Sequence, residues 1–174
     1  HGPGTKARLA ILIALNTGMA RQDLCESNRN MLRLKDSKLR IEYARGKTGV
    51  AADLPVIPEL AEELERLPSE QQLFLPKDDL CEPYKVPSFG NWFRNRCREA
   101  DVPGSIHGLR KAGATRRANA GASDWEIASY LAHTDTTQAS VYTKAANRSK
   151  LADSGFEKIG KLSNSSEELD KQEG

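Results

Sequence analysis

The sequence predicts a single domain that is mainly α-helical and carries a small three-stranded antiparallel β-sheet. In most segments apolar residues recur every three or four positions, the spacing that places them on one face of a helix. Between residues 31 and 57, by contrast, three short strand-like runs are separated by turn-forming residues, which is typical of a meander. At 174 residues the chain is long enough for one hydrophobic core and too short for two of ordinary size.

The first third of the chain is expected to hold two helices followed by the sheet. The first helix covers residues 5–16 and is broken at Asn16-Thr17-Gly18, and the second runs from about Ala20 to Asn28. Turns at Asp36-Ser37 and Gly46–Gly49 then separate the three predicted strands, which are Met31–Lys35, Leu39–Arg45 and Val50–Ile57.

The remainder of the chain is expected to be helical from Pro58 onward. Ser105 is placed to cap a helix that ends at Ala120, and Gly121 follows as a C-terminal stop. Ser123 and Glu126 form a capping box for the next helix. Its apolar residues, expected to face the core, are Trp125, Ile127, Tyr130 and Leu131. The other predicted helical segments are 58–67, 88–100, one that starts at Asp135, and 151–162.

Charge divides the chain into a basic body and an acidic end. We expect residues 1–162 to form the folded domain and residues 163–174 to be an acidic, disordered tail. The tail has a net charge of −3 in a chain of net charge +2, and the stretch 94–117 alone has a net charge of +5. A basic body favours a polyanionic partner such as double-stranded DNA.

Cysteine usage and hydropathy exclude several classes. Cys25, Cys81 and Cys97 are odd in number and far apart, which argues against a zinc site or a disulfide framework and for a reducing, cytoplasmic compartment. No apolar run approaches the roughly 20 residues that a membrane span needs. The first four residues lack the features of a signal peptide.

Five polar residues stand at spacings that suit attack on a phosphodiester. His107 and Arg110 lie one turn apart on one predicted helix, His133 follows the next helix, and Tyr142 comes nine residues later. Lys47 occupies the predicted hairpin turn. A tyrosine can supply the nucleophile, an arginine can donate two hydrogen bonds to phosphate oxygens, and histidine or lysine can transfer the proton.

These residues lie in motifs that resemble those of the tyrosine recombinase (phage integrase) family. The motifs are Leu15–Met19 leading into Asp23-Leu24, Gly46–Gly49, His107–Lys111, Leu131–His133 and Tyr142-Thr143. The resemblance covers residues 5 to 155 and implies a tyrosine recombinase catalytic domain that cleaves DNA through a 3′-phosphotyrosine. It also implies that no metal or other cofactor is required.

The resemblance further implies a role for each residue. Tyr142 corresponds to the nucleophile, Arg110 to the second arginine of the family's pair and Lys47 to the general acid. His107 corresponds to a proton-transfer residue, and His133 to a position held by His or Trp. For the full-length protein a homotetramer on DNA is implied, with an additional DNA-binding domain ahead of this one; the isolated domain is expected to be a monomer that lacks it.

The first arginine of the family pattern is where this chain departs. The family expects Gly-x-Arg-x-x-Asp/Glu, and here Ala20 stands at the arginine position after Gly18, with Arg21 one residue later. Either Arg21 reaches the phosphate through a small shift, or the site has lost an arginine. A helix turns about 100° per residue, so the offset is not trivial, but arginine is long and Gly18 is flexible. We favour Arg21.

Two other functions stay open on the sequence alone. A type IB topoisomerase shares the chemistry without joining two DNA sites. A DNA-binding regulator that has the fold but impaired catalysis would account for Ala20. A phosphate-binding P-loop is excluded, because the glycine required five positions before Gly46 is replaced by Ile41. The carboxylates also lack the clustering of two-metal nucleases.

Overall fold

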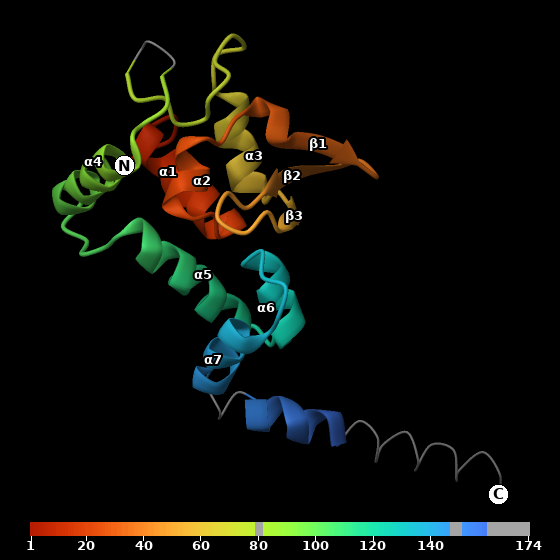
Figure 1. The fold of residues 1–174 in the computed structure, drawn as a ribbon. Helices are drawn as coiled ribbons and strands as arrows, with labels where there is room; N and C mark the ends of the chain where they lie inside the picture. The colour runs from red at the N-terminus through yellow and green to blue at the C-terminus, as the bar shows by residue number, and fades with distance from the viewer. Residues whose placement is uncertain (79–81, 147–150, 160–174) are drawn as a thin grey trace, which may run out of the picture.

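The predicted fold class is confirmed by the computed structural model, which describes residues 1–78, 82–146 and 151–159 (Figure 1). Helices dominate the described residues, and three short strands form one antiparallel sheet. The elements in chain order are α1 (Lys6–Thr17), α2 (Arg21–Cys25), the 3-10 helix η1 (Arg29–Met31), β1 (Leu32–Lys35), β2 (Lys38–Ala44), β3 (Ala51–Pro55), α3 (Pro58–Glu65), α4 (Val86–Glu99), α5 (Ile106–Asn119), α6 (Asp124–Tyr130) and α7 (Thr137–Ala145). Residues 151–159 are helical as well.

The sheet buries one face and exposes the other. Its strand order is β1-β2-β3, with Ile41 opposite both Leu32 and Leu54, and Tyr43 opposite Ala52. Because side chains alternate along a strand, Ile41, Tyr43, Ala52 and Leu54 all point into the core. The sheet is therefore a half-buried meander, as the residue pattern predicts.

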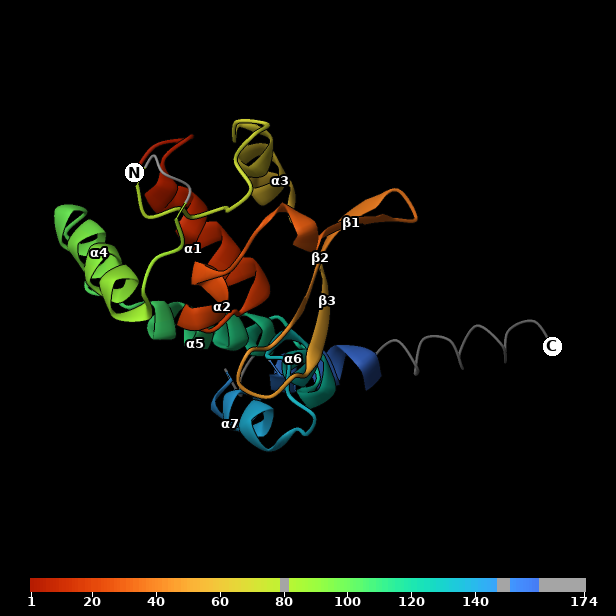
Figure 2. The same ribbon diagram turned by 45° about the horizontal axis from the view of Figure 1, so that its top comes forward.

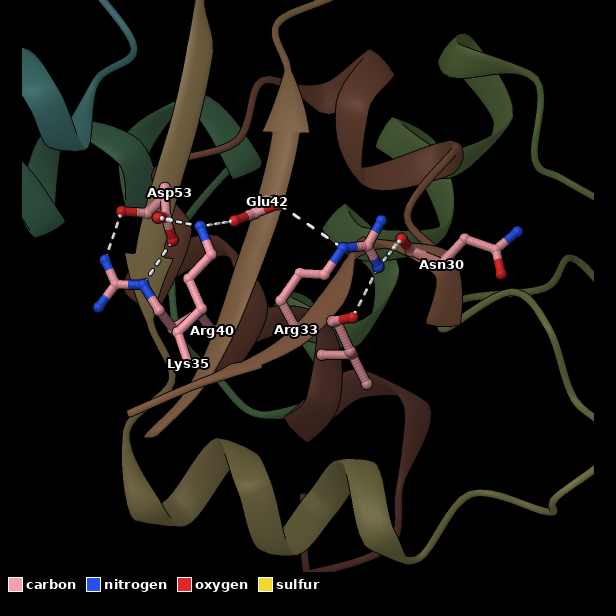
Figure 3. A network of polar contacts seen from close by, with 7 residues as sticks. Asn30, Arg33, Lys35, Arg40, Glu42 and Asp53 are labelled. Atoms are coloured by element: carbon pink, nitrogen blue, oxygen red, sulfur yellow. Dashed lines mark hydrogen bonds and ion pairs between the residues drawn. The ribbon is translucent and has the colours of Figure 1, made fainter. Parts of the chain in front are cut away.

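The outer face of the sheet carries a network of ion pairs (Figure 3). Lys35 of β1 pairs with Glu42 of β2 and, at 3.1 Å, with Asp53 of β3, while Arg40 lies 2.5 Å from Asp53. Hydrogen bonding to Glu42 raises the pKa of Lys35, and hydrogen bonding to Arg40 lowers the pKa of Asp53. All these side chains are at least partly open to solvent, so each pair adds little stability.

The core has two parts, one on each side of α5. The larger surrounds α1 and includes the inner face of the sheet, α3 and α4. The smaller lies among α5, α6 and α7. Figures 1 and 2 show α5 running beneath α1 and α2, from the end of α4 to the α6–α7 pair. This helix therefore connects the two parts of the core.

Tyr130 locks the smaller part of the core to α1. Its hydroxyl donates to the carbonyl of Leu15 at 3.2 Å, and the guanidinium carbon of Arg117 lies 3.5 Å from its ring centre. A Cβ atom at Gly113 would come within 1.9 Å of the Tyr130 hydroxyl oxygen, and one at Gly18 within 2.7 Å of the ring. Gly18 also ends α1 in the left-handed conformation, with φ +60°. Both positions consequently require glycine.

The capping signals of the sequence are confirmed. The hydroxyl of Ser105 accepts from the backbone N–H of Gly108 and starts α5, and Ser123 with Glu126 forms the capping box of α6. Gly121, in the left-handed conformation at φ +88°, follows the end of α5. Local hydrogen bonding is enough to determine these helix ends.

Two expectations at the level of elements are corrected. The second helix ends at Cys25 instead of Asn28, because the Ser27 hydroxyl bonds back to the Leu24 carbonyl and Asn28 forms a bridge with Leu73. Trp125 does not face the core and is 64% exposed. In a seven-residue helix, Ile127 and Tyr130 are sufficient to fill the buried face.

Three further expectations have different outcomes. In the segment 151–162, residues 151–159 are helical, but Leu151, Phe156 and Ile159 are exposed. Leu162, the tail 163–174 and Cys81 lie outside the described residues. Among the helices that the structure does describe, none has the length and apolar character needed to cross a membrane.

Candidate functional site

Helix α5 presents His107 and Arg110 toward the α6–α7 pair. His107 is exposed in the first turn, and Arg110, one turn later, is only 7% exposed. Burial of a guanidinium is costly, so its N–H groups require acceptors. Arg110 donates to the carbonyl of Gly18, to the carbonyl of Leu131 at 2.6 Å, and to His133 Nε2 at 3.2 Å. It thereby joins the ends of α1 and α6.

Arg110 keeps part of its donor capacity. A guanidinium has five N–H groups, and the three acceptors named above occupy one on Nη1 and both on Nη2. Among the described residues, these three contacts leave the Nε–H and the second Nη1–H for a ligand. Burial, followed by the charge of Arg45, lowers the pKa of Arg110. Arg110 is thus a buried cation with two donors to spare.

His133 follows α6 and returns to Arg110 through a tight turn. Ala132 adopts a positive φ of 48°, and the His133 backbone N–H bonds the Ala128 carbonyl at 2.9 Å. Because a guanidinium can only donate, His133 Nε2 must accept, which places the proton of the neutral ring on Nδ1. Burial, then the charges of Arg110 and Arg45, lower the pKa of His133. The ring is therefore neutral near pH 7.

Tyr142 lies on α7, half-buried, with one side packed against the smaller part of the core. It borders a cavity of about 420 Å³, here named the tyrosine hollow. The residues around this hollow are Arg45, His107, Arg110, Lys111, Leu131, His133, Gln138 and Tyr142. The structure thus brings together four of the six residues predicted from the sequence.

Lys47 is not among the residues that line this hollow. It is exposed in the turn between β2 and β3, while its neighbour Thr48 lines a second cavity, the hairpin hollow. That cavity, of about 320 Å³, is bordered by Arg45, Thr48, Val50, Ala132, His133, Thr134, Asp135 and Gln138. Asp23 holds the start of the turn, since its carboxylate accepts from the backbone N–H of Gly46 at 3.0 Å and from that of Ala20 at 3.1 Å.

Arg21 borders a separate cavity of about 490 Å³, the α2–α4 hollow, which shares Arg45, His107 and Arg110 with the tyrosine hollow. Its full lining is Met19, Ala20, Arg21, Arg45, Gly90, Arg94, Ser105, Ile106, His107 and Arg110. Arg21 is exposed at the first position of α2, and its Nη1 lies over Gly90 of α4, 2.6 Å from where a Cβ would stand. The guanidinium is thus directed toward α4.

Arg45 is the site residue that the sequence reasoning missed. It is half-buried just after β2, and it borders the tyrosine, α2–α4 and hairpin hollows. One signal could have found it, because Ile41, Tyr43 and Arg45 occupy alternate positions and therefore share the inward side of the strand. An arginine on the inward side at the end of the central strand, two positions before the predicted catalytic lysine, is a candidate for the site.

Chemically, the site combines a phenol, two histidines and several cations around one cavity. Cations and a neutral imidazole suit a ligand with negatively charged oxygens, and arginine in particular matches the geometry of phosphate. A phenol at the edge of such a cavity can attack the bound group. The arrangement therefore fits transfer of a phosphoryl group to tyrosine.

Comparison with known proteins points to one family. The sequence pattern of the Phage integrase family matches residues 3–148. The search of curated proteins found no match. Among solved structures, the XerA recombinase superposes with a TM-score of 0.66 at 15% sequence identity, covering 87% of this chain and 56% of that one.

Two DNA-bound structures are also similar. A lambda integrase dimer bound to a COC′ core site gives a TM-score of 0.63 at 25% identity, covering 79% of this chain and 42% of that one. The Tn1549 transposon integrase in complex with transposon right end DNA gives 0.68 at 17% identity, covering 89% of this chain and 59% of that one. The chain therefore spans about half the length of these proteins.

Proposed function

The chain belongs to the phage integrase family, and from this premise we propose that it cleaves and rejoins DNA strands at specific sites through a covalent bond to Tyr142. One observation carries the proposal: Tyr142, Arg110, His107 and His133 border a single hollow. The DNA-bound state of the similar lambda and Tn1549 integrases supports double-stranded DNA as the partner.

In the proposed reaction, a DNA phosphate enters the tyrosine hollow and its nonbridging oxygens accept from the two remaining N–H groups of Arg110. The Tyr142 oxygen attacks phosphorus as its proton leaves to a base, a role that we assign to His107. An oxygen–phosphorus bond to Tyr142 forms and the bond from phosphorus to the 5′ oxygen breaks. The products are a 3′-phosphotyrosine and a 5′-hydroxyl.

We assign the proton for the leaving 5′ oxygen to Lys47. This assignment requires the β2–β3 turn to bend toward the phosphate when DNA binds, because Lys47 does not line the hollow in the free protein. Rejoining reverses each step: a 5′-hydroxyl attacks the phosphotyrosine, and Tyr142 leaves. One phosphoester replaces another throughout, so resealing needs no ATP.

His133 has a positioning role in this scheme. It accepts from Arg110 through Nε2 and so holds the guanidinium against the Gly18 and Leu131 carbonyls. Its Nδ1–H remains available as a donor. Arg21 borders the α2–α4 hollow and Lys111 borders the tyrosine hollow. We expect these two side chains to contact DNA phosphates that flank the reacting one.

The test is capture of the covalent intermediate. A pool of nicked duplexes with random sequence is incubated with the protein, because a nick near the cleaved bond lets the 5′ fragment diffuse away and traps the adduct. We expect the wild type to give a denaturant-resistant protein–DNA adduct and Tyr142→Phe to give none, while both bind duplex DNA equally. An adduct that survives in Tyr142→Phe would refute the nucleophile assignment.

A second candidate function is a DNA-binding regulator with impaired catalysis, favoured by Ala20 at the arginine position of the family pattern. It predicts DNA binding by the wild type with no adduct from any duplex in the pool. A topoisomerase-like activity, by comparison, predicts relaxation of a supercoiled plasmid without exchange between two sites. For assembly, we propose a homotetramer on DNA for the full-length protein and a monomer for this chain alone, which analytical ultracentrifugation can test.

A further inference from the structure

The side chain of Arg45 has a buried N–H group without a hydrogen-bond acceptor in the described residues. Its Nε atom, like that of Arg96 on α4, is shielded from solvent and has no hydrogen-bond partner among residues 1–78, 82–146 and 151–159. A buried donor without an acceptor is destabilising, because it has lost its hydrogen bonds to water. Of the two, only Arg45 borders the same hollows as Arg110, so its Nε–H is available to a ligand that brings its own acceptor.

Like charges gather around this unpaired donor. The charge of Arg45 acts on both Arg110 and His133, and it lowers the pKa of each. The nearby carboxylate of Asp23 is already used, because its two oxygens accept from the backbone N–H groups of Gly46 and Ala20. Arg110 is buried and Arg45 is half-buried, and neither forms an ion pair with a carboxylate in the part of the chain that the structure describes. An anion would therefore stabilise this pair of cations.

Arg45 is better placed than Arg21 to act together with Arg110. Arg45 borders both hollows that Arg110 borders, whereas Arg21 borders only the α2–α4 hollow. Arg45 is also the first charge that acts on Arg110, and Arg21 is not among those identified. The Arg21 guanidinium lies over Gly90 of α4, and its side chain is exposed.

The small side chain at position 20 leaves room for such a substitute. Ala20 and Arg45 border the same α2–α4 hollow, together with His107 and Arg110. The backbone of the region is held in place from both sides, since Asp23 connects the N–H of Ala20 with the N–H of Gly46, next to Arg45. A guanidinium on the β2–β3 connection can therefore occupy space that an arginine at position 20 would have taken.

We propose that Arg45 is the second cation of the phosphate site, contacting the reacting DNA phosphate opposite Arg110 in place of the arginine that the family pattern expects at position 20. This inference rests on the proposed function and replaces Arg21 as the substitute. It assigns Arg45 a catalytic role, because its N–H groups touch the nonbridging oxygens on which negative charge develops.

The test first measures binding of inorganic phosphate by the whole chain, which requires no cleavage. The resonance of the Arg45 Nε–H group in wild-type protein is followed by NMR during a phosphate titration. We expect it to shift together with a resonance of Arg110. If Arg45 does not respond up to about 100 mM phosphate, a concentration that would reveal even weak binding, the proposal is overturned.

Variants then distinguish the contribution of Arg45 to phosphate binding from that of Arg21. The dissociation constant for phosphate should rise about tenfold in Arg45→Ala, the loss of one charge-assisted hydrogen bond, and less in Arg45→Lys, which keeps the charge. Arg33→Ala, on the outer face of the sheet, is the matched control for net charge and should bind phosphate like the wild type. A larger loss in Arg21→Ala than in Arg45→Ala would also overturn the proposal.

The final measurement uses a nicked duplex that the wild type attacks. Arg45→Ala should form the adduct at least about 100-fold more slowly. A methylphosphonate at the reacting position should restore much of this rate, because it removes the charge that Arg45 neutralises. An unchanged rate in Arg45→Ala refutes the role of Arg45 and leaves the proposed function intact. Arg45-dependent phosphate binding without any wild-type adduct refutes the cleavage activity and leaves the phosphate site intact.

Discussion

At the scale of single residues, the site depends on donors and acceptors that match only in one arrangement. Arg110 cannot accept a hydrogen bond, so its contact with His133 Nε2 exists only while that nitrogen carries no proton. Protonation would place a hydrogen between two cations. The neighbours that set this equilibrium are Arg110 and Arg45, which lower the pKa of His133, and Asp135, which opposes them.

We therefore predict that the protein loses stability as the pH falls below about 6.5, the ordinary pKa of histidine. The folded-state pKa of His133 is lowered, so the unfolded chain binds more protons between the two pKa values. Stability from this group is complete above the unfolded pKa and is lost as the pH falls through the folded one. The melting temperature of wild type should decrease between pH 7.5 and 5.5.

In His133→Gln, which can still accept from Arg110 but does not titrate, this decrease should be smaller. The pH range avoids most carboxylate titration, and His107→Gln, at an exposed position of the same site, is the control. Equal pH dependence of the melting temperature in wild type and His133→Gln would contradict the prediction.

At the scale of elements, the site is assembled by the junction of α1, α5 and α6. The Tyr130 ring fills the space between Gly18 and Gly113, and this contact holds the Gly18 and Leu131 carbonyls where Arg110 reaches them. The geometry of the phosphate site is thus a consequence of how closely three helices approach. Glycine is needed where the contact is tightest.

We predict that Gly113→Ala destabilises the fold by about 1–3 kcal/mol, the usual cost of overpacking a core. Its Cβ would lie 1.9 Å from the Tyr130 hydroxyl oxygen, and the Tyr130 ring cannot move without displacing α1. Thermal unfolding should show a drop of about 2–4 °C in melting temperature per kcal/mol.

Gly108→Ala is the matched control, because it lies in the same helix at an exposed position with only Ser105 Oγ nearby, at 3.4 Å. There alanine should raise the melting temperature, since it is a better helix former than glycine. Similar effects of the two substitutions would show that helix propensity, and not the contact with Tyr130, decides the outcome.

At the scale of the whole molecule, the tyrosine hollow and the α2–α4 hollow are both bordered by residues of a basic stretch that includes the end of α4 and most of α5. The stretch 94–117 has a net charge of +5. Arg94 borders the α2–α4 hollow and Lys111 the tyrosine hollow, and both side chains are exposed. Exposed cations beside a site for one phosphate are well placed to contact the phosphates on either side of it.

Binding of duplex DNA should accordingly weaken steeply with salt, because each contacted phosphate releases counter-ions. In Arg94→Ala and in Lys111→Ala, the slope of log affinity against log salt concentration should decrease by about 1. Fluorescence anisotropy with a labelled duplex measures this, and Arg66→Ala, an exposed arginine at the end of α3, serves as control. An affinity independent of salt would argue against DNA as the partner.

The sequence by itself determined those features that depend on neighbouring residues. Helix ends at Ser105, Ser123 and Gly121 were predictable because their capping groups lie within a few positions. The spacing of His107 and Arg110 was predictable because one turn of α5 brings them to the same face. The motif around Tyr142 added the predicted nucleophile to this pair.

Only the tertiary structure decided how residues distant in sequence meet. Arg45 is recognised as a site residue only in the structure, because β2 and α5 bring it to the same hollow as Arg110, which lies 65 positions further along the chain. Likewise, the exposure of the Trp125 side chain and the end of α2 at Cys25 depend on which parts of these helices the rest of the fold covers. Such contacts depend on the packing of the core, which local hydrogen bonding and periodicity do not encode.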